Sequence, residues 1–91
     1  MKLLVHWKTP PEHMKEVLSD FKASYAADGA LPGAGATMLG RWWEVGTGEG
    51  FALFEVDDQA AISGWLMAWS HLVEYRVRAV VDEEDFVPHM P

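Results

Sequence analysis

The fold is decided by the stretch TMLGRWWEVGTGEGFALFEV, residues 37–56. Its two ends, 37–45 and 51–56, are rich in residues that favour strands, and the glycine-rich segment 46–50 between them is typical of a turn. The stretch therefore predicts a β-hairpin. Because the glycines join strand to strand, no helix N-terminus follows them to receive a pyrophosphate, and the pattern is not a dinucleotide site.

A strand and a helix are predicted on each side of this hairpin. Residues 3–7 form a short apolar run, and Thr9 is expected to cap a helix that ends at Gly29. After the hairpin, Asp57 and Asp58 are expected to cap a second helix. Residues 73–81 alternate between apolar and polar side chains, as a strand does. The inner stripes of the two helices are Met14, Val17, Leu18, Phe21 and Tyr25, and Ile62, Trp65, Leu66, Trp69 and Leu72.

The order strand–helix–strand–strand–helix–strand predicts an α+β, ferredoxin-like fold. Right-handed crossovers then give a four-stranded antiparallel sheet with both helices on one face. The 91 residues are enough for one domain, 1–91, in which 82–91 is expected to be an acidic C-terminal tail.

A second copy is expected to cover the helix-free face of the sheet. The first three predicted strands are apolar at both parities, so both faces should be buried. A domain of this length buries only about 60–65% of its unfolded surface, and there is no cysteine for a disulfide or a thiolate metal site. With 49% hydrophobic residues and five tryptophans, the composition favours a homodimer in which two sheets pack face to face.

The charge balance excludes several classes of partner. Seven Lys and Arg against 14 Asp and Glu give a net charge of −7, which repels phosphate backbones, so no nucleic acid is expected. The longest apolar runs fall far short of the roughly 20 residues of a membrane helix, so no membrane role is expected. The first eight residues do not have the pattern of a signal peptide, and a cytoplasmic location is expected by default.

Several short motifs together resemble a bacterial family known as domain of unknown function 3303. They are the run from Trp7 to His13, then Leu39-Gly40-Arg41-Trp42, Gly50-Phe51-Ala52-Leu53, Asp57-Asp58 and Trp69-Ser70. In that family a histidine often follows Arg-Trp, whereas this chain has Trp43, so no role of that histidine carries over. At the level of the fold the chain also resembles the dimeric α+β barrels, which include cofactor-independent monooxygenases and muconolactone isomerases. The resemblance implies the fold and no catalytic residues.

A polar group is predicted on the helix-free face. His6 lies mid-strand on the parity opposite to Leu3, Val5 and Trp7, and Arg76 and Arg78 are expected to point the same way from the last strand. Glu55 is a fourth member, expected to pair with an arginine because a buried charge needs a partner. The group is either a small-anion or proton-transfer site, or a network of salt bridges in the dimer interface.

Arg41 and Trp43 complete the candidate site, since a guanidinium beside an indole can bind an anionic or aromatic ligand. Both parities of this strand are apolar, so the face on which they lie stays open. The leading hypothesis is a homodimer that binds a small aromatic or anionic molecule between its sheets, lined by His6, Arg41, Trp43, Glu55, Arg76 and Arg78. The alternatives are a cofactor-independent monooxygenase- or isomerase-like enzyme with His6 as proton acceptor, and a structural module without an open pocket. Neither a metal nor a cofactor is expected, because the four histidines have no ligand spacing.

Overall fold

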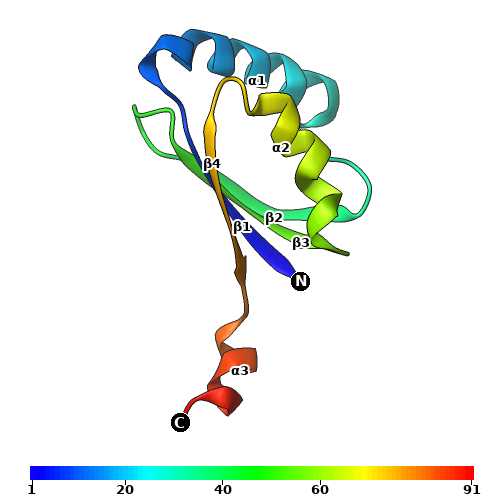
Figure 1. Cartoon of the computed structure of the whole chain (residues 1–91). Helices are drawn as coiled ribbons and strands as arrows, with labels where there is room; N and C mark the ends of the chain where they lie inside the picture. Colours follow the sequence, from blue (N-terminus) through cyan, green and yellow to red (C-terminus); the bar gives the residue numbers. More distant parts are fainter.

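Four antiparallel strands form one sheet, and the two longer helices cover one of its faces (Figure 1). The computed structural model describes all 91 residues. The strands are β1 (Lys2–Lys8), β2 (Ala36–Trp43), β3 (Gly50–Val56) and β4 (Glu74–Val80), in the order β2-β3-β1-β4. The helices are α1 (Met14–Asp28), α2 (Ser63–Trp69) and α3 (Glu83–Phe86), with 3-10 turns η1 (Pro11–His13), η2 (Gln59–Ile62) and η3 (Val87–His89). This is the predicted ferredoxin-like βαββαβ fold.

The helix ends agree in part with their sequence signals. Gly29 ends α1 in the left-handed conformation at φ 75°, as predicted. Asp58, but not Asp57, acts as a cap: it accepts a hydrogen bond from the Ala60 amide at 2.7 Å at the start of η2, which leads into α2, and α2 itself begins without a side-chain cap. The predicted cap by Thr9 is wrong, because its hydroxyl donates instead to the Gly48 carbonyl oxygen at 2.8 Å and ties β1 to the hairpin turn. The chain enters α1 through η1 without a side-chain cap.

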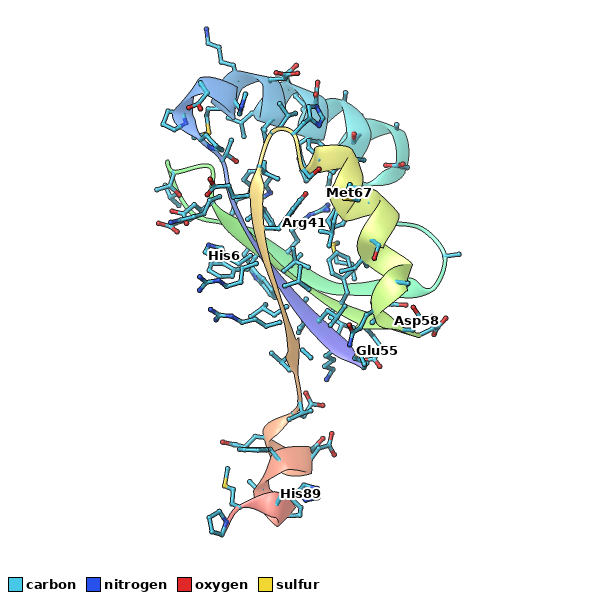
Figure 2. All side chains as sticks on the ribbon, in the orientation of Figure 1. His6, Arg41, Glu55, Asp58, Met67 and His89 are labelled. Carbon is cyan, nitrogen blue, oxygen red and sulfur yellow. The ribbon has the colours of Figure 1, made fainter.

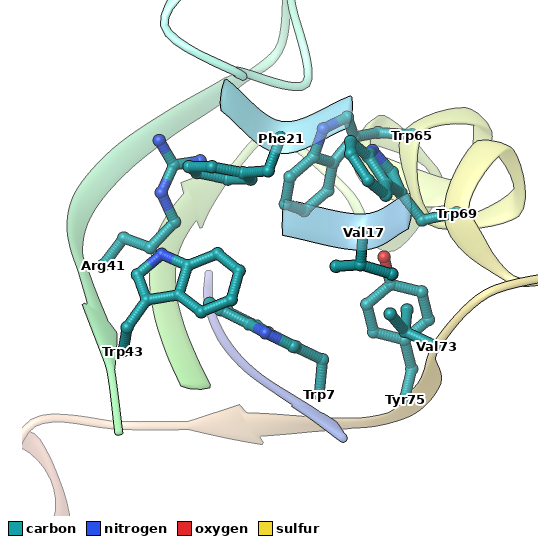
Figure 3. Close-up of a pocket in the computed structure, with 9 residues that line it drawn as sticks. All are labelled: Trp7, Val17, Phe21, Arg41, Trp43, Trp65, Trp69, Val73 and Tyr75. Carbon is teal, nitrogen blue, oxygen red and sulfur yellow. The ribbon is translucent and has the colours of Figure 1, made fainter. Parts of the chain in front are cut away.

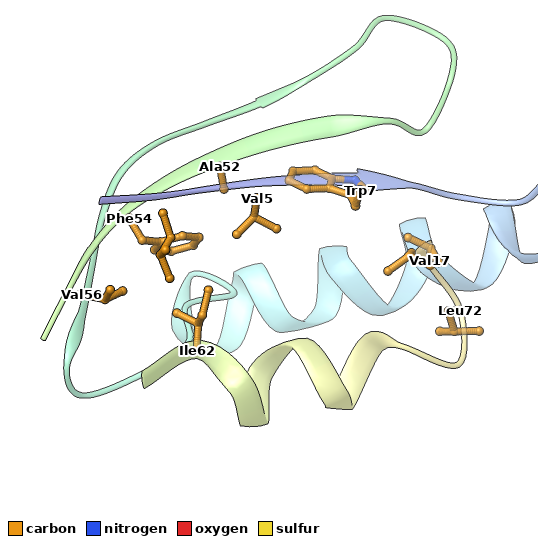
Figure 4. Close-up of a cluster of buried hydrophobic side chains, with 10 residues drawn as sticks. Val5, Trp7, Val17, Ala52, Phe54, Val56, Ile62 and Leu72 are labelled. Carbon is orange, nitrogen blue, oxygen red and sulfur yellow. The ribbon is translucent and has the colours of Figure 1, made fainter. Parts of the chain in front are cut away.

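Strand pairing sorts the side chains onto two faces of the sheet. Under the helices, Trp7 pairs with Gly50 and Tyr75, and Val5 pairs with Ala52 and Val77. These side chains and part of each predicted inner stripe enclose the core (Figure 4). The first stripe is wrong at two positions, because Leu18 and Tyr25 are 47% and 62% exposed. Burial of each large side chain of the core contributes about 1.5–3 kcal/mol. The core consists of Leu3, Val5, Trp7, Val17, Ala52, Phe54, Val56, Ile62, Leu72 and Val73.

The opposite face of the sheet is not covered by any helix (Figure 1). Three rows of paired residues cross it from β2 to β4. The first is Trp42, Phe51, His6 and Arg76; the second is Gly40, Leu53, Leu4 and Arg78; the third is Thr37, Glu55, Lys2 and Val80. The first two rows are therefore apolar toward β2 and β3 and end in arginines on β4, where Glu74 lies on the same face next along the strand. The expectation that this whole face is apolar therefore holds on its β2 and β3 side and fails on its β4 side.

The residues after β4 project from the rest of the chain, with α3 and η3 at the far end (Figure 1). The radius of gyration is 14.4 Å, whereas a compact domain of this length has about 12 Å. Lys2 holds the base of this segment through a 2.6 Å ion pair with Asp82. Its hydrogen bond to Asp82 raises the pKa of Lys2, so the ammonium stays charged over the physiological range. The predicted tail is thus anchored and partly helical.

Two glycines provide a matched test of the packing. A methyl group at Gly50 would meet the Trp7 indole and the Trp42 carbonyl oxygen, whereas nothing lies within 4 Å of the same position at Gly64 in α2. We expect Gly50→Ala to lower the free energy of unfolding by about 1–3 kcal/mol through overpacking. Gly64→Ala should raise it by up to about 1 kcal/mol through helix propensity. Urea denaturation measures both, and equal effects would contradict this account of Gly50.

Candidate functional site

An aromatic pocket lies between the sheet and the helices (Figure 3). Strands β1, β2 and β4, helices α1 and α2, and the residue before β4 all contribute to it. Eight of its nine lining residues are hydrophobic, and the one charged member is Arg41. The lining residues are Trp7, Val17, Phe21, Arg41, Trp43, Trp65, Trp69, Val73 and Tyr75.

The rings of this pocket meet mainly edge to face, the arrangement that aromatic quadrupoles favour. Trp43 contacts Trp7 with ring centroids 5.1 Å apart and Phe21 with centroids 4.9 Å apart, at interplanar angles of 72° and 75°. Phe21 also reaches the Trp69 ring at 6.4 Å. Phe21 and Trp43 thus form a rigid corner between α1 and β2.

Arg41 lies at this corner without a carboxylate partner. Its Nη1 donates to the Ala30 carbonyl oxygen at 2.6 Å and its Nη2 to the Gly29 carbonyl oxygen at 2.8 Å. Its Cζ lies 4.7 Å from the centre of the Phe21 ring, a cation–π distance. Burial lowers the pKa of Arg41, but a guanidinium titrates so high that the group stays cationic. The site therefore holds a fixed positive charge among aromatic rings.

The backbone that Arg41 clamps is itself strained. Gly29 and Ala30 both have positive φ angles, 75° and 51°. For alanine this left-handed conformation costs about 1–2 kcal/mol, and it persists because surrounding contacts hold it. The two Arg41 hydrogen bonds are such contacts, and they also satisfy carbonyls at the C-terminus of α1. Arg41 is thus held at a defined distance from α1.

The inner cavity opens toward an outer groove. Inside, the free volume is about 30 Å³, which is room for about one water molecule. The groove is much larger, about 490 Å³, and shares Phe21, Arg41 and Trp43 with the inner cavity. Its other lining residues are Lys22, Tyr25 and Met38. A ligand in the groove would therefore contact the guanidinium and two aromatic rings at once.

Tyr75 adds a hydroxyl group to the inner wall. Burial raises the pKa of Tyr75 above its ordinary value, so the hydroxyl stays protonated at neutral pH. No buried side-chain nitrogen or oxygen lacks a hydrogen-bond partner. The polar groups of the pocket are thus either paired or in contact with solvent.

The structure divides the six predicted site residues between the two faces of the sheet. Arg41 pairs with Ala52 and Trp43 with Gly50, which places both under the helices, away from the other four. The predicted single cluster in an inter-sheet cavity therefore does not form within the chain. The cause is a bulge in β2 between Met38 and Gly40, which adds one residue and inverts the parity of the strand after it.

The other four predicted residues lie on the helix-free face, and Figure 2 labels His6 and Glu55 among them. His6 stacks on Phe51 with ring centroids 4.5 Å apart, and its Nε2 lies 3.2 Å from a carboxylate oxygen of Glu49. His6 also lies beside Arg76 and lines a shallow hollow of about 190 Å³ with it. These contacts gather His6 and Arg76 in one place, with Arg78 next along the strand.

Glu55 does not pair with an arginine, so that prediction is wrong. It accepts a 2.8 Å hydrogen bond from the Met1 ammonium group. Arg76 and Arg78 are exposed and form no ion pair within the chain.

The sequence interpretation assigned the aromatic residues of the pocket to the core and missed their role as its walls. Trp7, Phe21, Trp65 and Trp69 come from three elements and are only partly covered, except for Trp7. The available signal was their position, because Phe21, Trp65 and Trp69 lie on the predicted inward stripes of two helices that face the strand carrying Trp7. No group of three or more His, Cys, Asp or Glu side chains is placed to hold a metal ion. None of the helices combines the length and apolar character needed to cross a bilayer.

The chain is similar to one protein family and to solved structures. One solved structure with a related arrangement is that of a Deinococcus radiodurans protein assigned as an antibiotic biosynthesis monooxygenase. It shares 12% identity over 90% of this chain and 94% of that one, with a TM-score of 0.44. No curated protein matches the sequence significantly. Residues 1–91 match the family described as domain of unknown function (DUF3303), and the chain belongs to this family.

Proposed function

We propose that this protein binds a small aromatic anion in the groove on the helix side of its sheet, with Arg41 holding the anionic group. The observation that carries the proposal is a guanidinium that has no carboxylate partner and lies at the mouth of an aromatic pocket. Such a charge is costly to desolvate unless an anion or ordered water completes its surroundings.

The geometry of Arg41 favours a carboxylate or a similar planar anion. Two of its N–H groups are used by the Ala30 and Gly29 carbonyls, and a guanidinium has five. The remaining donors are available to a ligand in a charge-assisted hydrogen bond. Because the two carbonyl contacts fix the guanidinium in advance, a ligand would not have to order it.

The groove favours an aromatic body on that anion. The Phe21, Tyr25 and Trp43 rings line it beside Arg41, and ring-to-ring contacts contribute about 0.5–1.5 kcal/mol beyond the buried area. The inner cavity of about 30 Å³ is too small for a ring. The ring is therefore proposed to lie in the groove against Trp43 and Phe21.

This proposal does not include proton transfer by His6. His6 and Arg41 lie on opposite faces of the sheet, so they cannot contact one ligand within a chain. An isomerase- or oxygenase-like reaction that uses both groups therefore has no support from the geometry. Arg41 can still bind the anionic group of a ligand without taking part in catalysis.

We further propose that two copies associate through the helix-free faces of their sheets. Trp42 is 57% exposed and Phe51 38% exposed there, adjacent to Leu4 and Leu53. Adjacent exposed apolar side chains of this size are typical of an interaction surface. A two-fold axis would place each apolar patch against its counterpart.

Ligand binding is tested by replacing Arg41. We expect benzoate or indole-3-acetate to bind the wild-type protein, measured by calorimetry and tryptophan fluorescence. Arg41→Met should weaken this binding about tenfold to a hundredfold, because a charge-assisted hydrogen bond is lost. Arg41→Lys keeps the charge but lacks the planar guanidinium. Its affinity for the acids should lie between those of the wild-type protein and Arg41→Met. The matched amides, benzamide and indole-3-acetamide, should respond little to either change.

The control for this experiment is Lys15→Met, which removes an exposed charge from α1 away from the groove. It should bind the acids as the wild-type protein does. Near-ultraviolet circular dichroism reports whether each variant retains its aromatic packing. If the acids do not bind, or bind Arg41→Met unchanged, Arg41 serves only to clamp the end of α1 and the proposal is wrong.

The dimer is tested by light scattering. The wild-type protein should have twice the 10.2 kDa mass of one chain. Trp42→Glu should weaken association at least about tenfold, since it sets two like charges face to face in the apolar patch. Met67→Glu is the matched control, because Met67 is 71% exposed on α2, away from this face. A wild-type mass near 10.2 kDa at hundreds of micromolar would refute the dimer.

A further inference from the structure

The segment 81–91 is an arm with apolar side chains and no surface of its own chain to bury them. It extends away from the sheet and ends in α3 and η3 (Figures 1 and 2). Phe86, Val87 and Met90 are 52%, 51% and 49% exposed. A helix of four residues is far shorter than the roughly 12–15 residues that an isolated helix needs in water. The arm therefore needs a partner surface to be stable.

The arm also carries charge that its own chain does not neutralise. It has four consecutive charged positions, Asp82-Glu83-Glu84-Asp85, and no Lys or Arg. Lys2 pairs with Asp82, whereas the other three acids form no ion pair within the chain. The partner surface should therefore be cationic as well as apolar.

The helix-free face of the sheet has both properties. Arg76 and Arg78 lie along its β4 side, exposed and without an acidic partner. Leu4 and Leu53 lie in the same row as Arg78, beside them. A cationic rim next to an apolar strip complements an arm with acids and apolar side chains.

The arm cannot reach this face in its own chain. It leads away from the end of β4 (Figure 1), whereas Arg76 and Arg78 lie earlier in the same strand. Contact in cis would require the chain to reverse at residues 81–82, where the ion pair between Lys2 and Asp82 fixes the base of the arm. A second chain presents the same face without such a reversal.

We infer that the arm docks on the helix-free face of a second copy of this chain. Glu83 and Glu84 of each copy lie against Arg76 and Arg78 of the other, and Phe86 and Val87 lie beside these arginines at the β4 edge of the apolar patch, while Trp42 and Phe51 face their counterparts. A two-fold dimer makes both contacts at once, because each copy gives an arm and receives one. The inference rests on the dimer proposed above and is independent of the ligand in the aromatic pocket.

A charge-swap experiment tests whether the contact is made between chains. The double variant R76E/R78E keeps its acidic arm, and the double variant E83K/E84K keeps its arginines. Each homodimer then sets like charges together and should weaken about tenfold or more. When the two variants are mixed, both arm contacts have opposite charges again, so a heterodimer should form with an affinity close to that of the wild-type dimer. Native mass spectrometry and sedimentation measure these species.

The matched control is E12K/E16K, which makes the same change of net charge on exposed positions in and before α1. It should dimerise as the wild-type protein does. Mixed with R76E/R78E it restores only one of the two arm contacts, so the heterodimer should be clearly weaker than the one formed with E83K/E84K. The rescue should shrink in high salt, because exposed pairs are screened. Weak homodimers that mixing does not rescue would overturn the contact between chains, and so would swapped variants that dimerise normally.

Truncation after Asp82 tests the contribution of the arm separately from that of the sheet-to-sheet contact. This variant keeps the ion pair with Lys2 and removes α3 and η3. Its dimer should dissociate at a concentration at least about tenfold higher than the wild-type dimer, since the arm's apolar side chains are lost. An unchanged dimer would overturn arm docking and leave the sheet-to-sheet dimer standing. A wild-type monomer would overturn both, while ligand binding at Arg41 would be unaffected.

Discussion

The packing of Trp7 across Gly50 is the contact on which the rest of the structure depends. Gly50 has no Cβ, and the Trp7 indole occupies the space that a Cβ would need. The indole can therefore lie flat over β3 and reach Trp43 on β2. This contact sets the depth of the core at one end of the sheet and forms the floor of the aromatic pocket. A larger residue at 50 would push Trp7 into the space that the pocket now occupies.

Arg41 converts this aromatic packing into a site with a charge. Its guanidinium bridges from β2 to the left-handed turn after α1 and stacks on Phe21. The two carbonyl contacts compensate part of the cost of burying the cation, but carbonyl oxygens carry only partial charge. A full negative charge at this position would compensate it better. The same contacts that stabilise the helix end thus leave the arginine suited to an anion.

Much of the fold could be predicted because its local signals are strong. The hairpin, the glycine end of α1, the Asp58 cap and the alternation of β4 each follow from residue types at fixed positions. Strand β2 is different: Leu39, Trp42 and Trp43 are apolar on both parities, so the bulge beside Leu39 leaves no trace in the hydrophobic pattern. Only strand pairing reveals that Arg41 and Trp43 lie under the helices.

The missed contacts of Thr9 and Glu55 have a related cause. The sequence offers Thr9 the free amides of a helix start and offers Glu55 an arginine. In the folded chain each side chain instead bonds to a group that the tertiary structure brings closer. Thr9 binds the Gly48 carbonyl across the sheet, and Glu55 binds the amine of Met1. Local propensity is a weak guide where a strand end meets a turn or a terminus, because the backbone groups there are free to bond.

The two faces of the sheet have different chemistry, and β1 joins them. Trp7 points into the aromatic pocket, while its neighbour His6 stacks on Phe51 on the helix-free face. Because consecutive residues of a strand point to opposite faces, the backbone that fixes one fixes the other. A sheet with a ligand on one side and a second subunit on the other would share this central strand between the two contacts. The position of β1 in the sheet therefore affects both the ligand site and the subunit contact. It is fixed most closely at Gly50, the partner of Trp7, where there is no room for a Cβ.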